Sequence, residues 1–82
     1  MKLILLGTSG CHLCEQAELI MAAFDQVEIE LIDIAEQEQW QEKYAIRIPV
    51  LYHPETKSEL GWPFDQQRVQ VFIDKCSLLR KN

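Results

Sequence analysis

Hydrophobic and polar positions along the chain follow two periods, and together they predict seven secondary-structure elements. A continuous apolar run from Leu3 to Leu6 is typical of a strand that is covered on both faces. The apolar residues Val27, Ile29 and Leu31 alternate with Glu28 and Glu30, which indicates a second strand over residues 27–34 with one apolar face. Between these strands, apolar residues spaced four, three and four apart predict a helix with one buried stripe, formed by Leu13, Ala17, Ile20 and Phe24.

The second half of the chain predicts a helix, a hairpin and a last helix. Residues 35–44 are rich in Glu and Gln, and Trp40 and Tyr44 lie four apart, so we expect a short helix that rests on the core through this aromatic pair. Residues 47–52, a turn at 53–57 and residues 58–60 predict the hairpin. The last helix, over residues 65–79, is indicated by an apolar stripe of Val69, Phe72, Cys76 and Leu79.

The predicted order of elements, βαβαββα, places the chain in the α/β class, with right-handed crossovers between parallel strands. The chain has 82 residues, fewer than the roughly 100–200 that usually make one domain, so we expect a single domain over residues 1–82. Hydrophobic residues at 48% and charged residues at 26% match an ordinary globular domain. This composition excludes a disordered or low-complexity chain.

Negative charge is concentrated in the first half of the chain. The net charge is −5, and no Lys or Arg occurs between Lys2 and Lys43. Nucleic acids and anionic membranes bind basic surfaces, so we expect neither as a partner. The apolar run near the start spans only four residues, short of the roughly 7–15 in the core of a signal peptide, and is better explained as a strand.

The number of cysteines argues against a secreted disulfide framework. Cys11, Cys14 and Cys76 are an odd number in a chain whose apolar content is sufficient for a core. We therefore expect a reduced, cytoplasmic thiol protein. Cys76 falls on the apolar stripe of the last helix, where we expect a buried and inert thiol.

The segment Cys11-His12-Leu13-Cys14 lies where the first strand leads into the first helix, the context of a redox-active C-x-x-C motif. At a helix start, free backbone N–H groups and the positive end of the dipole favour a thiolate on Cys11. Cys14 lies about one turn further along, within reach of a mixed disulfide on Cys11. The motif predicts Cys11 as nucleophile and Cys14 as resolving thiol.

Charged neighbours act on this thiolate in opposite directions. A protonated His12 would stabilise it, whereas Glu15 and Glu18 on the same helix oppose its formation. The spacing of the cysteine pair is also compatible with half of a metal site, or with two incidental core cysteines. Zinc needs about four ligands, and outside the pair only His12, His53 and Cys76 are candidates.

Nearly the whole chain resembles the glutaredoxin-like proteins of the thioredoxin superfamily, in particular the short bacterial type without an extra N-terminal strand. The resemblance rests on the Cys11-x-x-Cys14 motif, on Ile48-Pro49 before the third strand, and on Gly61 and Asp65 near the last helix. It implies a thioredoxin-like, glutaredoxin-type fold with a central mixed four-stranded sheet and helices on both faces.

The resemblance also implies where substrate binds. In these proteins the Ile48–Pro49 bond is cis and lies beside the nucleophilic cysteine, and the main chain of Ile48 pairs with the bound thiol substrate. Without the resemblance, Pro49 would be explained as a proline at an edge or at the start of a strand. The pattern departs from that of glutaredoxins at three places: Thr8 replaces a lysine, His12 a proline, and Gly61-Trp62 a glycine pair.

Further residues are candidates for substrate binding. Arg47 is suited to a glutathione carboxylate or to the Cys11 thiolate, with a plain surface arginine as the alternative. Trp62, together with Phe64, is expected either to form the wall of a groove or to pack on the core. His12 and Asp65 complete the candidate substrate-binding set.

These observations predict a small, monomeric cytoplasmic thiol–disulfide oxidoreductase that acts on a protein or glutathione disulfide. We expect no tightly bound cofactor, and either glutathione, as co-substrate, or a reductase restores the dithiol. One alternative is a binding module that holds a [2Fe–2S] cluster or a metal ion on the same cysteines. Another is an adaptor that keeps the fold without turnover, since a fold does not determine function.

Overall fold

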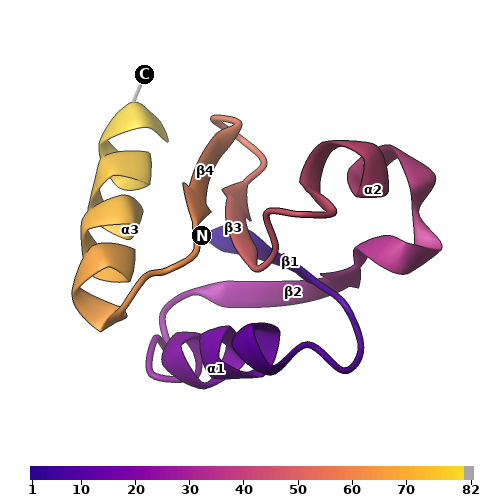
Figure 1. Ribbon diagram of the computed structural model, residues 1–82. Helices are drawn as coiled ribbons and strands as arrows, with labels where there is room; N and C mark the ends of the chain where they lie inside the picture. Colours follow the sequence, from indigo (N-terminus) through magenta and orange to yellow (C-terminus); the bar gives the residue numbers. More distant parts are fainter. Residues whose placement is uncertain (81–82) are drawn as a thin grey trace.

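The computed structural model describes residues 1–80 and shows a sheet with helices on both faces (Figure 1). The elements appear in the predicted order, with one added 3-10 turn, η1. Their bounds are β1 Lys2–Gly7, α1 His12–Met21, β2 Glu28–Asp33, η1 Ile34–Glu36, α2 Glu38–Tyr44, β3 Val50–His53, β4 Ser58–Gly61 and α3 Gln66–Arg80.

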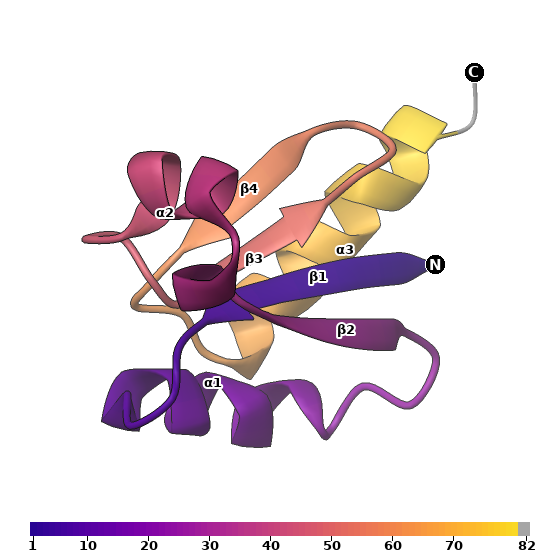
Figure 2. The ribbon, with the colours of Figure 1, turned by 90° about the vertical axis from the view of Figure 1, so that its right-hand side faces the viewer.

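The four strands form one mixed sheet in the order β2-β1-β3-β4 (Figure 2). Strand β2 runs parallel to β1, whereas β3 runs antiparallel to β1 and β4 antiparallel to β3. Leu5, at the centre of β1, lies opposite Leu31 of β2 and Leu51 of β3. The mixed four-stranded sheet and the α/β fold class predicted from the sequence are confirmed.

Each face of the sheet carries its own hydrophobic core, because successive side chains of a strand point to opposite faces. On one face, Leu3 and Leu5 of β1 pack with residues of α1 and α3. On the other face, Leu6 packs with Tyr44 of α2 and with residues of η1 and β3. The continuous apolar run of β1 therefore serves two cores, as expected of a central strand with both faces covered.

The predicted stripe of α1 is wrong by one position at its start. Cys14, Ala17 and Met21 are the buried residues of α1, whereas the side chain of Leu13 is 44% exposed. The helix begins at His12 with Cys11 as its N-cap, and this start turns Cys14 toward the sheet. Phe24 is buried as expected, but it lies in the turn beyond the helix.

Two further positions and one helix also differ from what the sequence predicts. Leu31 is 58% exposed because β2 is an edge strand, and Leu79, at the end of the expected α3 stripe, is 47% exposed. The single helix expected over residues 35–44 is divided into η1 and α2. Asp33 starts the separate turn η1, because its Oδ1 caps η1 by accepting a hydrogen bond from the backbone N of Ala35 at 2.9 Å.

The remaining expectations about packing are confirmed. The rings of Trp40 and Tyr44 lie 5.7 Å apart between centroids, and Trp40 packs against the core below α2. Cys76 is fully buried among residues of the α1 and α3 face. Within residues 1–80, the helices are too short or too polar to cross a membrane.

The two-sided burial of β1 predicts unequal effects of two leucine truncations. Leu3→Ala removes a fully buried side chain and should lower the free energy of unfolding by about 2–5 kcal/mol. Leu19→Ala, at a side chain that is 75% exposed, should change it by less than about 0.5 kcal/mol. Urea denaturation of both variants measures this, and similar losses in the two would contradict the description of the core.

Candidate dithiol active site

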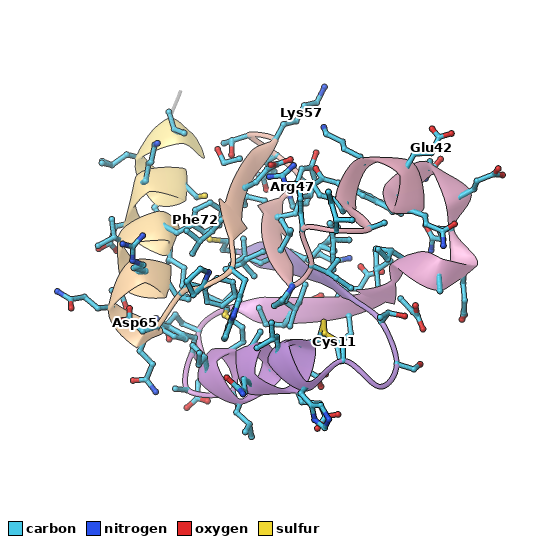
Figure 3. All side chains as sticks on the ribbon, viewed as in Figure 1. Cys11, Glu42, Arg47, Lys57, Asp65 and Phe72 are labelled. Atoms are coloured by element: carbon cyan, nitrogen blue, oxygen red, sulfur yellow. A yellow bond between two sulfur atoms is a disulfide. The ribbon has the colours of Figure 1, made fainter. Side chains whose placement is uncertain are left out.

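The cysteine pair lies at the start of α1, where the loop after β1 enters the helix. Figure 3 shows Cys11 at this end of the helix. Cys11 and Cys14 are joined by a disulfide, with their Cα atoms 5.2 Å apart. The backbone N–H of Cys14 donates a hydrogen bond to the Cys11 Sγ at 3.1 Å, so this sulfur is the N-cap of the helix. A sulfur in this position accepts a hydrogen bond and faces the positive end of the helix dipole, both of which stabilise a thiolate.

The two sulfur-bearing side chains differ in access to solvent. Cys11 is half-exposed, whereas only 4% of Cys14 is accessible. This difference suits an outer thiol that meets a substrate and an inner thiol that meets only its neighbour. The sequence prediction that Cys11 is the more exposed cysteine and Cys14 the more buried one is confirmed. Their roles as nucleophile and resolving thiol stay a prediction.

Gly10 turns the chain into the helix. Its φ of +74° lies in the left-handed region, which a residue without Cβ adopts at little cost. The first helical hydrogen bond then runs from the backbone N of Glu15 to the carbonyl oxygen of Cys11 at 3.1 Å. His12 is the first residue of the helix, and its side chain is exposed beside the motif.

The start of β3 lies beside the end of β1. Val50 pairs with Leu6, so the preceding Pro49 falls next to Gly7, where the chain leaves the sheet for the cysteine loop. The Ile48–Pro49 bond is cis, as the resemblance implied, and Trp62–Pro63 is a second cis bond that the sequence did not predict. Pro49 is fully buried, and its carbonyl oxygen accepts a hydrogen bond from the backbone N of Trp62 at 3.2 Å.

Arg47 is engaged with the polar cluster that links α2 to β4. Its Nη2 lies 2.7 Å from Oε1 of Glu59, and its guanidinium stacks 5.2 Å above the ring centroid of Tyr44. The hydroxyl of Tyr44 donates to Oε2 of the same carboxylate, and the ammonium of Lys43 lies 3.9 Å away. Through Tyr44 and Arg47, the cluster holds both ends of residues 44–47, the segment that precedes Ile48. Binding of a substrate by Arg47 stays a prediction.

The ionisation of this cluster follows from its contacts. Burial, followed by the hydrogen bond to Glu59, raises the pKa of Tyr44 to about 12. The same hydrogen bond, assisted by Arg47, holds the pKa of Glu59 below its usual value. Sequence reasoning did not identify Glu59, because a single acidic residue in a short strand carries no pattern.

Trp62 and Asp65 lie between β4 and α3. Trp62 is half-buried, packs edge-to-face on Phe64 with ring centroids 5.0 Å apart, and lines a shallow pocket of about 540 Å³. Asp65 lines the same pocket and caps α3, since its Oδ1 accepts from the backbone N of Arg68 at 2.8 Å. Figure 3 shows Asp65 at the start of α3, across the view from Cys11. Substrate binding by these two residues stays a prediction.

The other candidate ligands are separate from the pair. Burial raises the pKa of the Cys76 thiol, in keeping with an inert core residue. His53 is fully buried, and its Nδ1 lies 2.7 Å from the hydroxyl of Thr56. Within residues 1–80, no three His, Cys, Asp or Glu side chains are grouped as a metal ion would require.

Comparison with known families agrees with this geometry. The family described as Glutaredoxin-like domain (DUF836) matches residues 2–74. The chain belongs to this glutaredoxin-like family. The match includes both cysteines of the motif, the Ile48-Pro49 pair and the start of α3. No curated protein matches the chain.

Solved structures share the glutaredoxin-like fold of this chain. The X-ray structure of protein XcR50 from X. campestris is 33% identical, with a TM-score of 0.81, and the match covers 89% of this chain and 96% of that one. Its solution structure gives a TM-score of 0.78 at the same identity, covering 92% and 95%. Protein Ne2328 from Nitrosomonas europaea is 29% identical with a TM-score of 0.73, covering 87% and 88%.

The cluster around Glu59 predicts a change of stability with pH. Because its pKa is lower in the folded protein, the carboxylate stabilises the fold above its ordinary pKa of 4.5, and this contribution is lost as the pH falls below that value. Glu59→Gln should therefore lower the free energy of unfolding by about 1–3 kcal/mol at pH 7, and the difference from wild type should shrink below about pH 4.5.

Urea denaturation at a series of pH values measures this difference. Glu42→Gln, on the exposed surface of α2, is the charge-matched control and should change the free energy of unfolding by less than about 0.5 kcal/mol at pH 7. A difference between wild type and Glu59→Gln that stays constant down to pH 3 would contradict the role of the ionised carboxylate.

Proposed function

We propose that this glutaredoxin-like protein is a thiol–disulfide oxidoreductase of the cytoplasm that acts as a monomer on a protein or glutathione disulfide. One observation carries the proposal. A half-exposed cysteine caps α1, and a buried cysteine one turn further along is within bonding distance of it. Two thiols that differ in exposure at a helix start are suited to successive attack and resolution.

The first step uses the exposed sulfur. The Cys11 thiolate attacks one sulfur of the substrate disulfide, the substrate S–S bond breaks, and a mixed disulfide forms on Cys11. The second substrate sulfur leaves as a thiolate and takes up a proton from water. The hydrogen bond from the backbone of Cys14 and the positive end of α1 support the attacking thiolate.

The second step uses the buried sulfur. The Cys14 thiol loses its proton and attacks the Cys11 sulfur, so the mixed disulfide breaks and the Cys11–Cys14 disulfide forms. The remaining substrate sulfur leaves as a thiol, and two electrons have passed from the protein to the substrate. The Cys11–Cys14 disulfide of the structure supports this step.

Restoring the dithiol requires two electrons from outside the protein. Two molecules of glutathione, which become one glutathione disulfide, or a thiol reductase would supply them. In this scheme glutathione is a co-substrate and no cofactor stays bound. The main chain of Ile48, with side chains of His12, Arg47, Trp62 and Asp65, would contact the substrate; the exposure of His12 and the pocket beside Trp62 support this assignment.

Cysteine substitutions separate the two steps. Cys11→Ser should reduce turnover of a mixed glutathione disulfide at least a thousandfold, because the attacking sulfur is lost. Cys14→Ser should leave a stable adduct on Cys11 after exposure to oxidised glutathione, visible in the intact mass. Cys76→Ala, which changes only a buried core thiol, should turn over substrate within about twofold of wild type.

Two outcomes would contradict the proposed function. One is a wild-type protein that reduces no disulfide with either glutathione or a thiol reductase as electron donor. The other is an iron–sulfur chromophore, bound through Cys11, in anaerobically purified protein, which would favour the cluster-binding alternative.

A further inference from the structure

Gly7, the last residue of β1, lies directly against the buried cysteine of the motif. A Cβ added at Gly7 would lie 3.0 Å from the Cys14 Sγ and 3.2 Å from its Cβ. Optimal separations between carbon atoms are about 3.5–4.0 Å, and sulfur is larger than carbon. A side chain at position 7 would therefore press on the Cys14 side chain, which would have to shift by a few tenths of an ångström.

The backbone at this position does not itself require glycine. Gly7 is part of the regular β1–β2 ladder, opposite Asp33, and its φ is not in the left-handed region. Gly10 differs, since its φ of +74° favours glycine whatever surrounds it. Within residues 1–80 and apart from chain neighbours, the atoms within 4 Å of the added Cβ belong to Cys14 alone. The absence of a side chain at Gly7 thus leaves space for one neighbouring side chain, that of Cys14.

The space beside Gly7 is needed more by the disulfide form of the protein than by the dithiol form. In the disulfide, the bond to Cys11 restrains the Cys14 sulfur, which has little freedom to move away from a Cβ at position 7. In the dithiol, the Cys14 side chain is free to adopt another staggered rotamer. A cavity of about 240 Å³, lined by Gly7, Cys14 and Asp33 among others, lies beside it. A Cβ at Gly7 would therefore disfavour the disulfide relative to the dithiol.

We propose that Gly7 is a positioning residue for the resolving step: its lack of a side chain keeps the Cys14 sulfur within reach of Cys11. This inference rests on the proposed thiol–disulfide exchange and assigns a part of it to a residue outside the C-x-x-C motif. Gly7 touches Cys14 and acts through it. Attack by Cys11, whose sulfur lies on the solvent side of the pair, does not depend on Gly7.

Gly7→Ala tests this division of the reaction. At equilibrium with glutathione, its Cys11–Cys14 pair should shift toward the dithiol at least tenfold relative to wild type, which corresponds to about 30 mV in the reduction potential. During turnover, the variant should accumulate the mixed disulfide on Cys11. In a Cys14→Ser background, where only attack by Cys11 is observed, Gly7→Ala should change the rate of adduct formation by less than about twofold.

Gly61→Ala is the matched control, because a Cβ at Gly61 meets nothing within 4 Å and its φ is not positive. Its redox equilibrium should stay within twofold of wild type. If Gly7→Ala fails to fold, Cys14→Gly should rescue it by removing both the Sγ and the Cβ that the added side chain would meet, and the double variant should approach the stability of Cys14→Gly alone.

The outcomes separate this inference from the proposed function. A redox equilibrium unchanged by Gly7→Ala in an active protein would overturn the inference alone. Failure of Cys14→Gly to rescue an unfolded Gly7→Ala would also overturn it. A wild-type protein without disulfide exchange would instead contradict the proposed function.

Discussion

The cap of α1 by a sulfur atom is the interaction on which the site depends. The Cys11 Sγ accepts the hydrogen bond from the backbone of Cys14, so this sulfur and the start of the helix are one structural feature. Because the helix begins at His12, Cys14 turns inward and Leu13 turns toward solvent. The same start thus decides which thiol is exposed, which is buried, and which atom faces the helix dipole. Helix capping thus places two identical side chains in different surroundings.

The sheet determines where α1 starts and holds the segments around that start in place. Because β1 is buried on both faces, its position in the sheet is fixed. Its last residue, Gly7, is therefore held close to the side chain of Cys14. Strand β3 brings Pro49 to the same end of the sheet, and the cluster of Tyr44, Arg47 and Glu59 holds the segment before it. Negative charge on α1 acts against a thiolate nearby, so the local hydrogen bond and dipole at Cys11 have to outweigh it.

The parts of the structure that could be predicted from the sequence are those that depend on local pattern. The run from Leu3 to Leu6 identified the central strand, and the spacing of the cysteines placed the motif at a helix start. Periodicity predicts Leu13 on the buried face, where the structure has Cys14, because a repeat gives a stripe without its phase, and the helix cap determines the phase. Leu31 was expected inside because alternation does not reveal that its strand is at the edge. Glu59 could not be found, since its partners come from residues 12 to 16 positions away in the chain.

Site-resolved alkylation of the fully reduced protein tests the central claim most directly. With iodoacetamide at pH 7, and peptide mass spectrometry to follow each cysteine, Cys11 should be modified at least tenfold faster than Cys14 and Cys76 in the folded state. All three cysteines should react at similar rates in urea. If Cys14 reacts as fast as Cys11 in the folded protein, the helix start does not distinguish the two thiols, and this account of the site is contradicted.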